Sequence, residues 1–257
     1  DVHITHPILD GHPAGAGIFI TYPKVSQELS VVDAKTEIKN TSDKEKVVEL
    51  RHTLYTWKKQ KGKDKKVQNI SETLTLHPGV TIENLYVLST EVVENGKVVD
   101  KEETRIGIRH IEMSIEKGFV INGKPLRLVG SNRHMEYPYV GNAISDQAQY
   151  RDMYQIRSNG FNIVRLGHYP QATAALDACD ELGLLAIEPI PGWQFFNKNP
   201  LFISLTHRDV RDMIRRDRNH PSIVMWETTL NESWPPAEWK EGVVKIAHEE
   251  LPGDQCF

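Results

Sequence analysis

The chain has 257 residues, 39% of them hydrophobic, and a formal net charge of −4 at pH 7. This length allows one large domain or two modest ones, and the hydrophobic fraction supports a real core. A pI near 6.3 argues against a nucleic-acid partner, which would need a basic face. No apolar run approaches the roughly 18 residues that span a bilayer, so we expect no membrane partner.

Two further features bear on the compartment. No signal peptide is visible at Asp1, a start that fits a cytoplasmic chain or a periplasmic or secreted one whose leader has been removed. Cys179 and Cys256 are too few for a disulfide framework. Cys179 lies in a predicted helix, where we expect it to be a small buried hydrophobe.

The first part of the chain, up to about residue 111, predicts antiparallel β structure. Several segments alternate apolar and polar residues with period two, which is typical of strands with one buried face. Asn95-Gly96 between two such segments predicts a two-residue hairpin turn, and we also expect turns at 40–43 and 61–64. The pattern indicates a β-sandwich of about 100 residues, with strands at 17–22, 29–39, 47–57, 71–76, 85–94 and 97–108.

The pattern changes from residue 112 onward, where strands alternate with helices. A small hairpin is predicted around Asn122-Gly123. Four strand-helix repeats follow, which favours a parallel sheet with helical crossovers. The predicted strands are 126–130, 161–166, 184–187 and 223–226, and the predicted helices are 145–159, 173–182, 206–217 and 237–250.

Each predicted parallel strand is followed by polar or aromatic residues rather than by plain turn residues. Because parallel strands end at one edge of a sheet, we expect these residues to form a single rim, as at the active face of a (β/α)₈ barrel. An open doubly wound sheet is the alternative, but residues 129–132 lack its phosphate-binding glycines. The rim residues are Asn132, Arg133, His134, Arg165, His168, Glu188, Trp193, Asn231 and Glu232.

The pair Asn231-Glu232 follows the apolar strand 223–226, a position that suits catalysis. The simpler interpretation is a loop carboxylate with an Asn that caps the next helix. Trp226 has two interpretations as well, a core residue or a platform that stacks on a sugar face.

Four ordered blocks resemble glycoside hydrolase family two, which contains β-galactosidases, β-glucuronidases and β-mannosidases. They read GFVINGKPLRLVGSNRH, NGFNIVRLGHYP, DELGLLAIEP and RRDRNHPSIVMWETTLNES. The resemblance implies a multi-domain protein of β plus α/β class. Residues 1–111 would be an immunoglobulin-like β-sandwich, and residues 112–257 would be the first half of a TIM barrel. The chain would then be a middle fragment of a longer enzyme.

The resemblance implies a retaining glycosidase of β-galactosidase type, acting on terminal β-D-galactosides or related β-glycosides. Glu232 would be the acid/base, and Asn231 would bind the sugar 2-hydroxyl. Arg165 and His168 would line the sugar site, with Arg165 also able to hold a catalytic carboxylate ionised. His134 would bind sugar hydroxyls, and Trp193 would stack on the sugar.

Some parts of the family pattern are missing here. The nucleophile of the family lies on a later strand, beyond Phe257, so we expect this fragment alone to be inactive. Residues 191–194 lack the Glu and His that hold magnesium in some β-galactosidases, so we expect no metal and no cofactor. Glu188 matches a different family position and is not assigned to catalysis. The resemblance leaves homo-oligomerisation of a full-length chain open.

Two other functions compete with a glycosidase. One is a non-catalytic carbohydrate-binding or interaction module with a degenerate barrel, which would bind sugar without turnover. The other is a nucleotide-dependent α/β enzyme, which the missing glycine-rich loop disfavours.

Overall fold

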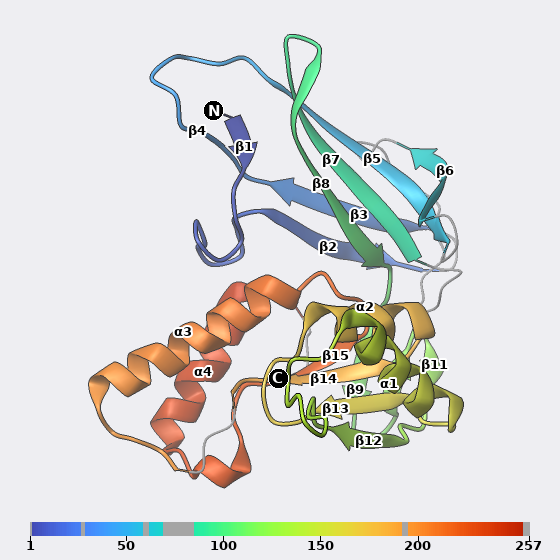
Figure 1. Ribbon diagram of the computed structural model, residues 1–257, viewed down its shortest axis with the longest axis vertical. Helices are drawn as coiled ribbons and strands as arrows, with labels where there is room; N and C mark the ends of the chain where they lie inside the picture. The colour runs from blue at the N-terminus through green and yellow to red at the C-terminus, as the bar shows by residue number, and fades with distance from the viewer. Residues whose placement is uncertain (1, 27–28, 59–61, 69–84, 192–194, 254–257) are drawn as a thin grey trace. The chain divides into compact units, whose positions relative to one another are not determined.

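The computed structural model describes residues 2–26, 29–58, 62–68, 85–191 and 195–253. The chain divides into two compact units, residues 1–110 and 111–257 (Figure 1). None of the helices in these ranges is both long and apolar enough to cross a membrane.

The first unit is built from antiparallel strands. A four-stranded sheet has the order β6-β5-β7-β8, and two strand pairs, β2-β3 and β1-β4, accompany it. The strands are β1 (Val2–Ile4), β2 (Ile18–Val25), β3 (Ser30–Thr36), β4 (Ile38–Asn40), β5 (Glu49–Lys58), β6 (Gly62–Gln68), β7 (Leu85–Glu94) and β8 (Lys97–Gly107).

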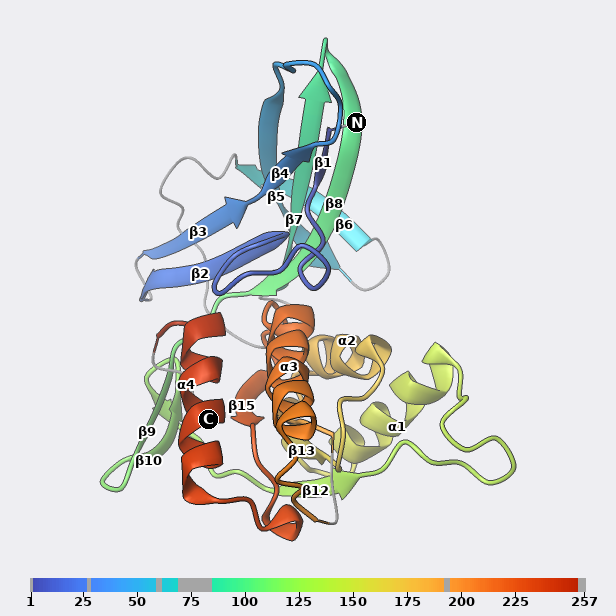
Figure 2. The same cartoon turned by 90° about the vertical axis from the view of Figure 1, so that its left-hand side faces the viewer.

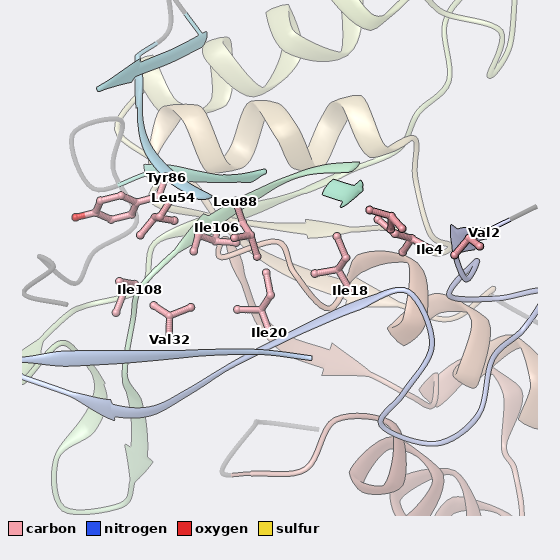
Figure 3. Packing of buried hydrophobic residues seen from close by; sticks show 11 residues of the cluster. Val2, Ile4, Ile18, Ile20, Val32, Leu54, Tyr86, Leu88, Ile106 and Ile108 are labelled. Atoms are coloured by element: carbon pink, nitrogen blue, oxygen red, sulfur yellow. The ribbon is translucent and has the colours of Figure 1, made fainter. Parts of the chain in front are cut away.

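The core of this unit lies between the β2-β3 pair and the larger sheet. Figure 3 shows Ile20 and Val32 on one side and Leu88 and Ile106 on the other. All four side chains are at most 8% exposed. Alternate apolar residues on each strand therefore meet in one layer, as period two predicts.

The turn predictions for this unit have mixed outcomes. The hairpin at Asn95-Gly96 is confirmed, with φ of 50° and 75° as a type I′ turn requires. The turn at 40–43 is confirmed as well, because the Asn40 side chain accepts the Ser42 N–H at 3.0 Å. The turn predicted at 61–64 is wrong, since β6 already begins at Gly62 and pairs with β5. The predicted strand 71–76 lies outside the described residues.

The second unit combines a small antiparallel sheet, a parallel sheet and four helices. The small sheet consists of β9 (Ile111–Ser114), β10 (Gly118–Ile121) and β11 (Lys124–Pro125), and it contains the predicted hairpin at Asn122-Gly123. The parallel strands are β12 (Gly130–Arg133), β13 (Ile163–Leu166), β14 (Leu185–Pro189) and β15 (Ile223–Glu227). The helices are α1 (Asp146–Ser158), α2 (Thr173–Leu182), α3 (Pro200–Asp217) and α4 (Ala237–Glu250).

The order of the parallel strands, β12-β13-β14-β15, follows the chain without a reversal. A doubly wound sheet would reverse its order at a switch point, whereas a barrel adds each strand beside the last. Figure 2 shows the four helices following one another in the same order. The second unit is therefore a partial TIM barrel, as the strand-helix alternation predicts.

Helices α1, α2 and α4 match their predictions closely. Ser145 caps α1 by accepting the Ala148 N–H, and Gly183 ends α2 in the left-handed conformation. Helix α3 is longer than predicted, because Asn199 caps it and Pro200 occupies its first turn.

The first parallel strand is also displaced from its prediction. The prediction placed it at 126–130, but β12 covers the more polar residues Gly130–Arg133. Gly130 pairs with Ile163 so closely that a Cβ there would lie 2.6 Å from the Ile163 side chain. Backbone pairing with β13, rather than apolar content, therefore decides where this strand lies.

Candidate functional site

The four parallel strands end at one edge of the sheet. Their last residues are Arg133, Leu166, Pro189 and Glu227, and all three strand pairings are parallel. The segments that follow the strands therefore leave the sheet on the same side, as at the active face of a barrel.

Side chains on these strands alternate between two faces. We call one the open face, defined by the half-buried residues Arg165, Ile187, Met225 and Glu227. The other is the helix-facing side, whose residues Leu166, Glu188 and Trp226 are at most 2% exposed. Register pairs such as Arg165 with Ile187 share a face, because neighbouring residues in parallel strands point the same way.

The strongest contact on the open face joins Arg165 to Glu227. Arg165 Nε donates to Glu227 Oε2 at 2.8 Å, and Nη2 donates to Oε1 at 2.5 Å. This two-point bond raises the pKa of Arg165, and attraction to Glu232 adds to the rise although burial opposes it. Arg165 was expected to hold a catalytic carboxylate, but its hydrogen-bonded partner is Glu227.

Sequence reasoning missed Glu227. The predicted strand covered 223–226, one residue short of the observed end of β15, and Glu227 was not among the candidates. Period-two alternation from Met225 was the available signal, because it places Glu227 on the same face as Met225.

Glu232 lies just beyond β15, in a 3₁₀ turn formed by Asn231–Ser233. Its Oε2 is buried and has no hydrogen-bond partner among the described residues. An unpaired buried polar atom costs stability, and a catalytic role is one of the reasons for which proteins retain such an atom.

The alternative role for Asn231, as the cap of the next helix, is wrong. The cap position of α4 is Pro236, and no side chain bonds there. The side chain of Asn231 lies outside the described part of the chain, so its predicted contact with the sugar 2-hydroxyl stays a prediction.

His134 and His168 come together from the ends of two neighbouring strands. Their rings meet edge to face, with centroids 5.3 Å apart. His168 Nδ1 is buried and has no hydrogen-bond partner within the described ranges. The structure thus brings the two predicted histidines together, and their predicted contacts with sugar stay predictions.

The outcome differs for three further residues that the sequence proposed for the site, two tryptophans and one arginine. Trp226 is a core residue, since it is 2% exposed on the helix-facing side. Arg133 is not on the rim: its buried side chain turns toward α1 and donates to Asp152 at 2.8 Å. Trp193 lies outside the described residues, so its predicted stacking stays untested.

A second group of acids lies on the helix-facing side. Glu188 is fully buried, with Oε1 3.5 Å from Arg216 Nη2, and Arg216 also binds Asp217 through two hydrogen bonds. Burial raises the pKa of Glu188 well above its usual range, and the nearby Asp217 carboxylate adds to the rise. Glu188 therefore favours its neutral form and faces away from the open face.

One cluster has ligand atoms close enough for a metal ion. Asp177, Asp180 and His220 offer such atoms within 4.8 Å of one another. Asp180, however, already accepts the His220 ring nitrogen at 2.7 Å and the Ser222 N–H at 2.9 Å. Hydrogen bonds thus account for the positions of Asp180 and His220, and they tie α2 to the start of β15.

Comparison with known proteins gives a consistent result. Residues 113–248 match the family model for the TIM barrel domain of glycosyl hydrolases family 2. A β-galactosidase of Thermoanaerobacter pseudethanolicus is 40% identical over 177 residues, which make up 68% of this chain and 23% of the relative. A putative β-glucuronidase of Formosa agariphila is 37% identical over 162 residues, covering 63% of this chain and 19% of the relative.

Solved structures agree with the sequence comparisons. The crystal structure of a Bacteroides uniformis β-glucuronidase aligns over 97% of this chain with a TM-score of 0.79 and 26% identity. The alignment covers 33% of that protein. The chain thus spans about a third of that structure and about a quarter or less of the curated relatives described above.

Proposed function

This chain belongs to glycosyl hydrolase family 2, and from that premise we propose that it is part of a retaining β-glycosidase in which Glu232 is the acid/base. The observation that carries the proposal is the state of Glu232 at the rim. One of its carboxyl oxygens is buried without a hydrogen-bond partner among the described residues, and Arg165 lies within electrostatic reach.

A retaining glycosidase needs two carboxyl groups about 5–5.5 Å apart, one as acid/base and one as nucleophile. In the first step Glu232 protonates the glycosidic oxygen as the bond to the anomeric carbon breaks. In the second step it removes a proton from the attacking water. Arg165, His134 and His168 would line the sugar site, with Asn231 at the 2-hydroxyl.

The nucleophile is part of the same proposal. Glu227 shares the open face and bonds Arg165, but the family resemblance places the nucleophile on a later strand. We therefore expect the nucleophile on a strand other than the four described, in line with the greater length of the relatives. The 257-residue chain by itself should then show no turnover, and turnover by it would refute this part of the proposal.

The test uses a full-length protein that contains this chain. In the Glu232→Gln variant, kcat/KM on an alkyl or phenyl β-galactoside should fall by about 10²–10⁴-fold. The loss on a 2,4-dinitrophenyl β-galactoside should be much smaller, because this leaving group departs without protonation. Azide, a nucleophile that needs no general base, should restore turnover of the dinitrophenyl substrate.

The matched control is Glu241→Gln, which makes the same change at an exposed position of α4. It should retain wild-type rates on both substrates. Equal rates in Glu232→Gln and wild type would refute the role of Glu232. Sugar binding without turnover by the full-length wild-type protein would favour a non-catalytic module instead.

The sugar is proposed to be galactose. The two β-galactosidases among the relatives, each 40% identical to this chain, support this choice. The putative β-glucuronidase of Formosa agariphila shares 37% identity, and the solved Bacteroides uniformis β-glucuronidase shares 26%. A tenfold or greater preference for an aryl β-glucuronide over the β-galactoside would refute the sugar assignment and leave the hydrolase assignment intact.

The first unit is proposed to be an immunoglobulin-like sandwich. Its neighbouring strands β5, β7 and β8 have the order of strands C, F and G in that fold, and β6 lies beside β5 as C′ does. The layer packed against them contains β2 and β3. An experimental structure in which β3 has no place in the opposite sheet would refute this assignment.

A further inference from the structure

Two of the segments that leave the parallel sheet carry His134 and His168, and a buried glutamine joins these segments. Gln171 is 1% exposed, although it lies in the connection between β13 and α2. A buried side-chain amide needs an acceptor for its N–H and a donor for its oxygen, because each unpaired polar atom costs stability. Gln171 finds both at Arg133, the last residue of β12.

The contact between Gln171 and Arg133 has two points. Gln171 Nε2 donates to the main-chain oxygen of Arg133 at 2.8 Å, and Gln171 Oε1 accepts a hydrogen bond from Arg133 Nη1. The Gly167 N–H donates to the same Arg133 oxygen at 2.9 Å. The two donors to this oxygen stand before and after His168 in the chain, so they hold the segment that carries His168 against the end of β12.

Further hydrogen bonds tie each partner to a helix. Arg133 Nη2 donates to Asp152 on α1 at 2.8 Å, and these two side chains are only 5% and 16% exposed. The main-chain oxygen of Gln171 accepts a hydrogen bond from Arg216 on α3 at 2.9 Å. Hydrogen bonds are electrostatically stronger in such surroundings than in water. The contact between Gln171 and Arg133 therefore joins two segments that are each held to a helix as well.

The two histidines lie next to this contact. His134 directly follows the end of β12, and its ring meets the His168 ring edge to face with centroids 5.3 Å apart. The Met135 N–H donates to the Tyr169 hydroxyl at 3.2 Å, which joins the same two segments again. No hydrogen bond from His168 Nδ1 to a described residue holds that ring. Its position therefore depends on the main chain that Gln171 holds.

We propose that Gln171 is a positioning residue, whose contact with Arg133 sets the spacing of His134 and His168 in the sugar site. This inference rests on the proposed function, in which the two histidines line that site. Gln171 acts through the main chain and needs no contact with substrate. Misplacing a group by about 1 Å can cost roughly 100-fold in rate, so loss of the contact should be visible in turnover.

The test is Gln171→Met in a full-length protein that contains this chain. Methionine has a similar shape but no amide group, so both hydrogen bonds to Arg133 are lost. On a 2,4-dinitrophenyl β-galactoside, whose reactive leaving group keeps slow variants measurable, kcat/KM should fall by about 10–100-fold. In a His134→Ala/His168→Ala background the same substitution should change kcat/KM by less than about threefold, because no imidazole is left to position.

The two backgrounds separate positioning from a merely structural role. A residue that only stabilises the fold would lower kcat/KM by the same factor with and without the histidines, and that result in folded protein would overturn the inference. Gln171→Glu is the second variant if Gln171→Met does not fold. It keeps the acceptor for Arg133 Nη1 and loses the donor, so its loss should be smaller and should also disappear in the background without the histidines.

Two controls accompany these variants. Gln147→Met makes the same change at an exposed position of α1 and should retain wild-type rates. Asp180→Ala removes a buried residue that holds the start of β15, so it should lower the melting temperature without lowering kcat/KM. Thermal melting shows whether each variant is folded at the assay temperature. A loss of kcat/KM in Asp180→Ala equal to that in Gln171→Met would overturn the inference, because lost stability would then explain both.

The outcomes also separate this inference from the function on which it rests. Wild-type rates in folded Gln171→Met, combined with a strong loss in Glu232→Gln on a phenyl β-galactoside, would refute the role of Gln171 alone. Wild-type rates in His134→Ala/His168→Ala would refute the predicted sugar contacts and this inference with them. Full activity of Glu232→Gln would refute the acid/base assignment, and the comparison of backgrounds would still decide the role of Gln171.

Discussion

The two faces of the parallel sheet carry similar acids in different surroundings. On the open face, Glu227 and Arg165 are about one-fifth exposed and bond each other. On the helix-facing side, Glu188 has no exposed surface and is raised in pKa by burial. The comparison teaches that alternation along one strand separates charges available to a ligand from charges that belong to the packing.

The largest expected difference in the free energy of unfolding is between alanine substitutions of two neighbouring residues of β15, Met225 and Trp226. Trp226→Ala should lower the free energy of unfolding by about 3–5 kcal/mol, because it removes a buried indole on the helix-facing side. Met225→Ala, on the half-buried open face, should lower it by roughly 1–2 kcal/mol. Equilibrium urea unfolding of both variants measures the two losses of stability. Equal losses would contradict the distinction between the open face and the helix-facing side.

A smaller difference in the free energy of unfolding is expected between alanine substitutions of two acidic residues, Asp180 and Glu227. Asp180→Ala should cost about 3 kcal/mol, because it leaves the buried Ser222 N–H and the His220 ring without their partner. Glu227→Ala should cost no more than about 1 kcal/mol, because water can replace part of its contact with Arg165. The same urea experiment checks this, with Glu241→Ala as an exposed control. A Glu227 loss as large as that of Asp180 would contradict the distinction.

The smallest effect is a change in pH dependence. In the folded chain Glu188 keeps its proton above pH 4.5, where the unfolded carboxyl loses it. The unfolded state therefore binds fewer protons, and the free energy of unfolding should fall as the pH rises above 4.5, by at most about 1.4 kcal/mol per pH unit. Glu188→Gln should remove this contribution, so its stability should decline less as the pH rises above 4.5. Parallel stability curves for the variant and wild type would show that Glu188 titrates normally.

Local signals predicted much of the second unit. Ser145 before α1 and Gly183 after α2 mark helix ends through their own backbone and side-chain chemistry. The start of α3 carried a comparable signal in Asn199-Pro200, which the prediction did not use. Strand β12 carried none, because Gly130–Arg133 is polar and its position depends on pairing with β13.

The candidate site likewise contains some features that the sequence predicted and others that it did not. Family motifs and strand ends were enough to name Glu232, Arg165, His134 and His168 as candidates. The sequence offered no way to choose the partner of Arg165, since Glu227 is 62 residues away and the pair spans β14. Arg133 was misplaced for a related reason, because the first strand was predicted too early and its alternation was not followed to the helix-facing side.

The order of strands and helices, the hairpin turns and the polar residues after each strand follow from the sequence itself, because each depends on residues close together in the chain. Which carboxylate pairs with which arginine was decided only in the folded chain. Register across the parallel strands brings Glu227 to Arg165, whereas the packing of α3 against the sheet brings Arg216 to Glu188, and a single segment contains neither the register nor the packing.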